Sequence, residues 1–330
     1  MSADISLKSH ITVMLLSRTY KVLLTVFVSL IVVMIGIVIF FGTRTSQSEL
    51  CADDWSGEVA VLPIDGTPLF VTVAPGLRFR IDTGSDVSCI TEKDLETLRS
   101  MGYEANESFY PLLGRNSLGD SHVYTKRYRV DVPFCRYECE TDTFGNRSYR
   151  MNSSVVNVFH NVDFVPASAD HSTLGIDFLE NFILEYRHND HLLLLHRDLP
   201  DGYEPCVDLQ VSRSPWNWMR VGHRYYIDVS LDQIHDDYFI DTGMRHAYMK
   251  APCSRIPQHK DLDSYQVSTY RGDHEAQIDP AGWLAIGDRE GPAIVYYYDN
   301  GEEDYSFNPL NLKEMDVVVD FIGNRLMFRR

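Results

Sequence analysis

Beyond the first 50 residues, the pattern of hydrophobic and polar positions is short and β-like. Runs of about four to eight residues recur that alternate between apolar and polar positions or are rich in β-branched and aromatic side chains, whereas long amphipathic helical patterns are scarce. The clearest runs are LFVTV, RFRI, HVYT, RYRVDV, VVNVF, FILEY, HLLLLH, RYYIDVSL, AIVYYY, MDVVVDF and RLMF. One short helix is expected in EKDLETLRSMG, residues 92–102. The pattern therefore predicts an all-β protein.

A continuous apolar segment stands near the N-terminus. From Val22 to Gly42, Thr25 and Ser29 are the only polar side chains. About 20 such residues span a bilayer as a helix. The core of a signal peptide is shorter, and no small-x-small cleavage site follows, so we expect a retained transmembrane anchor, with removal as the alternative.

The charges that flank this segment predict its orientation. Lys8, Arg18 and Lys21 precede it, whereas Arg44 is the one nearby cation after it and is followed by acidic residues. Cytosolic flanks carry the excess of Lys and Arg. We therefore expect a single-pass type II membrane protein with a cytosolic tail and a lumenal or extracellular C-terminal part, on the virion surface if the chain is viral.

The cysteines and glycosylation signals fit a secretory compartment. An oxidising compartment would allow up to three disulfide bonds of open connectivity among the six cysteines, although Cys89 is equally well explained as a buried thiol. The cysteines are Cys51, Cys89, Cys135, Cys139, Cys206 and Cys253. Asn-x-Ser sequons stand at Asn106, Asn146 and Asn152, consistent with a glycoprotein.

Composition limits the number of domains and the class of partner. A chain of 330 residues with 44% apolar content can bury enough surface for two ordinary domains. The net charge of −17 argues against nucleic acid as a partner, because phosphate binding needs clustered cations. Pro200, Gly202 and Pro205 suggest a connector. The expected divisions are a tail (1–21), an anchor (22–42), a stalk (43–54), an N-terminal lobe (55–200) and a C-terminal lobe (201–330).

The two lobes repeat one order of elements. In the first, LFVTV leads through a Pro-Gly turn into LRFRIDTG; in the second, YYIDVSL leads through DQIHD into DYFIDTG. The ends of the lobes, FILEYRHNDHLLLL and VVVDFIGNRLMF, correspond as well. The chain therefore contains an internal duplication that places one acid, Asp82 or Asp241, after the same strand in each lobe.

Two adjacent aspartates can perform acid–base chemistry that a single aspartate cannot. Two carboxylates that face each other at about 3 Å cannot both ionise, so they share one proton over a broad pH range. One oxygen then acts as base toward a bound water while the other acts as acid toward a peptide carbonyl. Glycines allow close backbone packing beside the carboxylates, and threonine hydroxyls can hydrogen-bond across the two loops.

FRIDTGSDVSCIT and YFIDTGMRHAYM resemble the two active-site loops of the aspartic proteases, the pepsin-like and retropepsin-like group, and TLGIDFLENFILEY resembles the segment beside the catalytic loop. The resemblance implies a bilobal β fold with an active cleft between the lobes and a catalytic unit within one chain. It implies that the catalytic dyad is Asp82 and Asp241, with Thr83 and Thr242 as interlocking hydroxyls. The supporting loop residues are Thr83, Gly84, Ser85, Thr242 and Gly243.

Three features depart from the family pattern. Ser85 can donate to the outer oxygen of Asp82, but Met244 at the matching position cannot do so for Asp241. The second lobe reads NPLNLK where the first has Leu174 and Gly175, so the glycine is absent. The candidate for the tyrosine of a substrate-covering flap is Tyr124, in GDSHVYTKRYRV; an ordinary strand aromatic is the alternative.

The sequence therefore predicts a membrane-anchored aspartic endopeptidase that hydrolyses a polypeptide with water activated between Asp82 and Asp241. No cofactor and no metal are expected. His188, His191 and His196 fall on a turn and a strand and are expected to be surface histidines. The alternative is a noncatalytic surface or envelope protein that keeps the protease fold as a binding scaffold.

Overall fold

The structure is a computed structural model. It describes residues 19–37, 58–65, 69–108, 112–115, 121–143, 147–212, 223–232, 234–244, 249–258, 261–269, 272–299, 305–309, 312 and 315–329. The chain forms two compact units, Met1–Ser46 and Gln47–Arg330. Each unit is described by itself.

The first unit contains an apolar helix, Thr19–Ile37. Its mean hydropathy is 2.4, and its apolar side chains are exposed. A helix of 19 residues is about 28 Å long, close to the thickness of a bilayer's hydrocarbon core. The helix begins before the predicted Val22, while residues 38–42 of the predicted anchor and the stalk lie outside the described residues.

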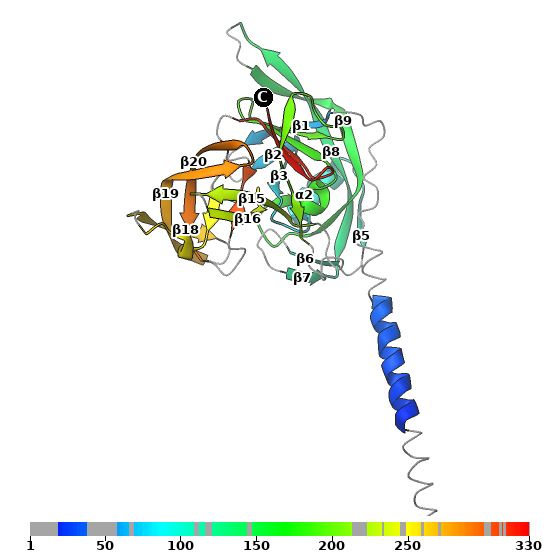
Figure 1. Ribbon diagram of the computed structural model, residues 1–330. Helices are drawn as coiled ribbons and strands as arrows, with labels where there is room; N and C mark the ends of the chain where they lie inside the picture. Colours follow the sequence, from blue (N-terminus) through cyan, green and yellow to red (C-terminus); the bar gives the residue numbers. More distant parts are fainter. Residues whose placement is uncertain are drawn as a thin grey trace, which may run out of the picture. The chain divides into compact units, whose positions relative to one another are not determined.

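The second unit begins with the N-terminal lobe (Figure 1). Its strands are β1 (Glu58–Asp65), β2 (Phe70–Ala74), β3 (Leu77–Asp82), β4 (Cys89–Ile90), β5 (Ala105–Ser108), β6 (Leu112–Arg115), β7 (Ser121–Tyr124), β8 (Arg127–Thr141), β9 (Arg147–Pro166), β10 (Ser172–Gly175), β11 (Ile183–Arg187) and β12 (Leu192–His196). Its helices are α2 (Glu92–Ser100) and α3 (Ile176–Leu179). The predicted helix is confirmed as α2, and the hydroxyl of Thr91 caps it by accepting from the backbone N–H of Asp94.

The C-terminal lobe follows. Its strands are β13 (Tyr203–Asp208), β14 (Gln210–Val211), β15 (Tyr225–Leu231), β16 (Ile234–Ile240), β17 (Met249–Ala251), β18 (Asp263–Thr269), β19 (Gly272–Ile286), β20 (Arg289–Tyr297), β21 (Ser306–Phe307), β22 (Val317–Asp320) and β23 (Arg325–Arg329), with a 3-10 turn η2 (Cys253–Arg255). Strand β13 begins inside the predicted connector, because Tyr203 to Asp208 pair with β23.

The two lobes are built on the same unusual pairing scheme. In the first, β3 runs parallel to β10, β10 pairs antiparallel with β4, and β4 runs parallel to β9. In the second, β16 runs parallel to β21, β21 pairs antiparallel with β17, and β17 runs parallel to β20. The predicted duplication is therefore present in the strand topology, and β3 and β16, which lead to the two acids, occupy matching places.

A sheet joins the lobes. Three strands of the C-terminal lobe and three of the N-terminal lobe follow one another in the order β13-β23-β22-β11-β12-β1, and β11 pairs with β22 across the lobe boundary. One cluster of buried apolar side chains extends through both lobes. The eleven predicted strand segments all coincide with observed strands. The prediction of a mainly β, bilobal aspartic-protease fold preceded by an apolar helix is confirmed.

Candidate active site

The two Asp-Thr-Gly loops meet at the ends of β3 and β16. Asp82 is the last residue of β3, and Asp241 directly follows Ile240 at the end of β16. Both strand ends are held by parallel neighbours: Asp82 stands opposite Gly175 of β10, and the N–H of Asp241 donates to the carbonyl of Phe307 at 3.0 Å. Each acid is thus placed by a rigid, buried strand pair.

Threonine side chains lock the two loops together. The N–H of Thr83 donates to Oγ1 of Thr242 at 3.1 Å, and the N–H of Thr242 donates to Oγ1 of Thr83 at 3.0 Å. Each hydroxyl then donates to a backbone carbonyl of the opposite strand, that of Ile240 at 2.9 Å and that of Ile81 at 3.2 Å. Both threonines are buried. The four hydrogen bonds form a reciprocal pattern that fixes one loop against the other.

The glycines bring the carboxylates close to the opposite loop. A Cβ at Gly84 would lie 2.5 Å from Oδ1 of Asp241, and a Cβ at Gly243 would collide with the carboxylate of Asp82. Each glycine N–H also donates to the carboxylate of its own loop, at 2.9 Å in both cases. The absence of a side chain at these positions is what lets each carboxylate lie against the opposite loop.

A polar network supports the first loop. The Oγ of Ser85 donates to the carbonyl of Val87 at 2.7 Å, and its carbonyl accepts the N–H of Ile176 at 2.8 Å. Behind it, the Oγ of Ser88 donates to Asp177 at 2.7 Å. Burial raises the pKa of Asp177 to about 7, and the hydrogen bonds from Ser88 and from the N–H of Phe178 only partly oppose this. The expected donation from Ser85 to Asp82 is not made in this arrangement, because the single hydroxyl proton of Ser85 goes to Val87.

Arg80 is a site residue that the sequence analysis missed. Its Nη2 lies 3.6 Å from Oδ2 of Asp82 and donates to the carbonyl of Gly243 in the opposite loop. Its Nη1 is 3.4 Å from Nε2 of His171. Residues two apart on a strand share one face, so the position of Arg80 two residues before Asp82 was the available signal. The guanidinium places a positive charge beside the candidate dyad.

The second loop lacks the serine found in the first. Met244 occupies the position that matches Ser85, and its side chain packs against an apolar cluster of Val267, Ala276 and Tyr298. A thioether at this place supplies packing to β18, β19 and the end of β20. The methionine that stands in place of a serine is therefore part of the hydrophobic packing of the C-terminal lobe.

Tyr124 lies on a separate two-stranded hairpin formed by β6 and β7. Its side chain packs against the cluster of Val87, Cys89 and Val165, and a Cβ at Gly114 of the same hairpin would collide with Val87. The hairpin therefore lies beside the chain that follows the first catalytic loop. The role of Tyr124 in a flap stays a prediction.

Two expectations about cysteine and histidine are corrected. Cys89, Cys135, Cys206 and Cys253 are free thiols, so three disulfide bonds do not form; Cys51 and the side chain of Cys139 lie outside the described residues. Cys89 and Cys135 are enclosed in different apolar clusters on β4 and β8.

His196 is buried rather than at the surface. Its Nε2 lies 2.7 Å from Glu185, which also accepts from Nε of Arg187 at 2.7 Å and from the hydroxyl of Tyr203 at 2.6 Å. Burial alone would raise the pKa of Glu185, but these three donors lower it to about 2. This network ties β11 to β12 and β13 in the sheet that joins the lobes.

Comparisons with known proteins identify no family. No protein-family model matches the chain, and no curated protein matches it. Among solved structures, the chain is similar to basic 7S globulin from soybean (TM-score 0.46, 10% identity, 82% of this chain and 94% of that one). It is likewise similar to edgp (0.47, 10%, 84% and 95%) and to conglutin gamma, a basic 7S globulin from lupine seeds (0.46, 10%, 82% and 94%). At these TM-scores and identities, the likeness carries no argument about activity.

Proposed function

We propose that the second unit, Gln47–Arg330, is an aspartic endopeptidase whose dyad is Asp82 and Asp241. The observation that carries the proposal is the reciprocal set of hydrogen bonds through Thr83 and Thr242, which holds two loops with acids at their tips face to face. Many β proteins contain an acidic turn, but this reciprocal hydrogen-bond pattern forms only when each of the two loops carries its threonine.

The proposed reaction uses water as the nucleophile. One ionised carboxylate takes a proton from a water while the water oxygen bonds to the peptide carbonyl carbon, and the protonated carboxyl donates its proton to the carbonyl oxygen. The resulting tetrahedral diol loses the amine when the C–N bond breaks, with one proton transferred to nitrogen and one returned to the dyad. The proton balance closes within the pair, and the reaction calls for neither cofactor nor metal. The pKa values that set the pH dependence of hydrolysis are properties of the pair and not of either aspartate alone.

A cleavage assay tests this proposal. The unit from residue 43 onward is incubated with a peptide library between pH 3 and 7, with and without a statine-type inhibitor. We expect inhibitor-sensitive cleavage that is lost in both Asp82→Asn and Asp241→Asn. Cleavage that survives either substitution would overturn the dyad mechanism.

A second candidate is a noncatalytic protein that binds a polypeptide on the same scaffold. Two observations favour it: the guanidinium of Arg80 lies 3.6 Å from Asp82, and Met244 gives no polar support to the second loop. The guanidinium forms an ion pair with the Asp82 carboxylate, which is a structural contact that catalysis by the dyad does not use. A folded wild-type unit that cleaves nothing across the pH range, yet binds a polypeptide with a measurable dissociation constant, would support this candidate.

The membrane placement is part of the proposal. The apolar helix Thr19–Ile37 is long enough to cross a bilayer, and the cations before it favour a cytosolic N-terminus with the lobes lumenal or extracellular. Asn106 is exposed and begins an Asn-x-Ser sequon, so its glycosylation reports whether the lobes lie on the lumenal side. In a glycosylating expression host, we expect Asn106→Gln to remove a glycan, and cytosolic lobes would show none.

A further inference from the structure

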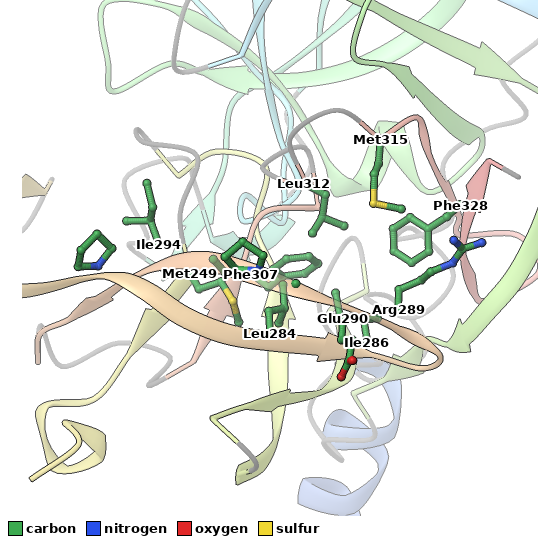
Figure 2. A pocket seen from close by; sticks show the side chains of 14 residues that line it. Met249, Leu284, Ile286, Arg289, Glu290, Ile294, Phe307, Leu312, Met315 and Phe328 are labelled. Carbon is green, nitrogen blue, oxygen red and sulfur yellow. The ribbon is translucent and has the colours of Figure 1, made fainter. Parts of the chain in front are cut away.

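The C-terminal lobe contains a partly open, mainly apolar cavity of about 510 Å³ (Figure 2). Side chains of the β19–β20 hairpin form one side, and Leu312 and Met315 face them from the other. Phe307 and Phe328 complete the apolar wall. Cavities of about 300–1,000 Å³ with mostly apolar lining are typical of small-molecule sites. Asp82 and Asp241 are not among the described lining residues, so this cavity is distinct from the candidate active site.

Few charges line the cavity. Arg289 and Glu290, at the start of β20, are the two charged side chains among its described lining residues. Their formal charges cancel, and Nε1 of Trp283 lies 3.4 Å from Glu290. The lining therefore favours a neutral occupant over a strongly charged one.

The matching place in the N-terminal lobe is filled by aromatic rings. The chain after β10 forms α3, where the ring of Phe178 lies 5.4 Å from that of Phe159, 6.2 Å from that of Phe134 and 5.1 Å from that of Phe182, between centroids. All four phenylalanines are buried. Aromatic rings at such separations pack favourably in a core.

Strand register identifies the equivalent segment of the C-terminal lobe. Leu174 of β10 stands opposite Ile81, just before the first acid, and Phe307 of β21 stands opposite Ile240, just before the second. The chain that follows β21, residues 308–316, reads NPLNLKEMD and contains no aromatic residue. The C-terminal lobe therefore has no sequence counterpart for the rings of Phe178 in α3 and Phe182 just after it, and the cavity borders this segment through Leu312 and Met315.

We propose that this cavity binds a compact, neutral molecule with an aromatic ring system, which takes the place that the rings of Phe178 and Phe182 fill in the N-terminal lobe. The site is a binding site and not a second catalytic centre. It does not depend on the proposed peptidase activity. A bound ring would contact mainly the aliphatic, methionine and phenylalanine side chains of the lining and would leave solvent on entry, which is the driving force for apolar ligands.

Gly291 is a position at which a substitution can fill the cavity. Gly291 lines the cavity, and a Cβ added to it would meet nothing within 4 Å. It stands opposite Leu284 across the β19–β20 pair, so its side chain would point to the same face as that of buried Leu284. Gly291→Phe therefore places a ring in the cavity. Ala293, two residues along the same face, allows the smaller filling Ala293→Leu. Ile322 is 54% exposed and outside the lining, so Ile322→Phe is the matched control.

The test is a titration with the neutral fluorophore N-phenyl-1-naphthylamine, using the compact unit from residue 47 onward, which carries its own core. Wild type and Ile322→Phe should show saturable binding at one site and a concentration-dependent rise in melting temperature. Gly291→Phe should weaken binding at least tenfold. The probe should no longer raise the melting temperature of this variant. If Gly291→Phe does not fold, Ala293→Leu gives the same comparison.

Two results would overturn the proposal. One is wild-type protein that shows no saturable binding. The other is a filled variant that binds the probe as tightly as Ile322→Phe.

Discussion

The guanidinium of Arg80 lies 3.6 Å from the carboxylate of Asp82, on the same face of strand β3. The same guanidinium donates to the carbonyl of Gly243 in the opposite loop. One cation therefore touches both halves of the candidate active site. Its charge bears directly on the choice between a peptidase and a noncatalytic scaffold.

Loss of the Arg80 guanidinium should weaken the contact between the two loops. Arg80→Leu removes the donor to the carbonyl of Gly243 in the opposite loop. A hydrogen bond from a charged group contributes about 1.5–3 kcal/mol, so the free energy of unfolding should fall by about 2 kcal/mol. Urea denaturation measures it. Arg80→Lys keeps a cationic donor and should recover part of the loss, whereas an unchanged free energy of unfolding in Arg80→Leu would contradict this role.

Loss of the Thr83 hydroxyl should weaken the lock between the loops. Thr83→Val removes the acceptor for the N–H of Thr242 and the donor to the carbonyl of Ile240, and both partners lie in the buried core of the site. Unsatisfied buried groups cost about 1–3 kcal/mol each, so the free energy of unfolding should fall by about 2 kcal/mol or more. Urea denaturation measures it. Thr83→Ser keeps the hydroxyl and should recover most of the loss.

Glu185 should stabilise the protein at neutral pH and not at strongly acid pH. Its folded-state pKa is lowered from 4.5 to about 2, so its stabilisation is present above pH 4.5 and disappears as the pH falls through 2. At about 1.4 kcal/mol per unit, Glu185→Gln should cost up to about 3 kcal/mol at pH 7. Denaturation curves between pH 2 and 7 test this. The exposed Glu96→Gln serves as control, and an equal loss at pH 2 would show that shape and not charge is responsible.

Asp177 should have the opposite effect. Its folded-state pKa is raised from 3.8 to about 7, so the folded state keeps a proton that the unfolded state has lost, and stability should fall as the pH rises from about 4 to 7. Asp177→Asn keeps an oxygen for Ser88 and for the N–H of Phe178 and should remove this slope, with a gain of at most about 4 kcal/mol at pH 8. The same denaturation series tests it, with exposed Asp201→Asn as control. An unchanged slope in Asp177→Asn would contradict the assignment.

The sequence by itself determined the elements and the loops. Alternating apolar runs became strands because a pleated strand with one buried face requires that period, and the short helix expected within residues 92–102 formed as α2. The two copies of Ile-Asp-Thr-Gly carried the duplication, since the tetrapeptide holds the acid, the hydroxyl and the glycine that the reciprocal loop contacts use.

Only the tertiary structure decided the surroundings of those loops. Arg80 reaches Gly243, His196 reaches Glu185, and the apolar cavity forms between β20 and the chain after β21, each through pairing of segments far apart in sequence. Local sequence sets backbone geometry, because its forces act within a few residues. The partner of a buried charge, or the volume left beside a strand, depends on which distant strands come together, and that is fixed by the packing of the whole core.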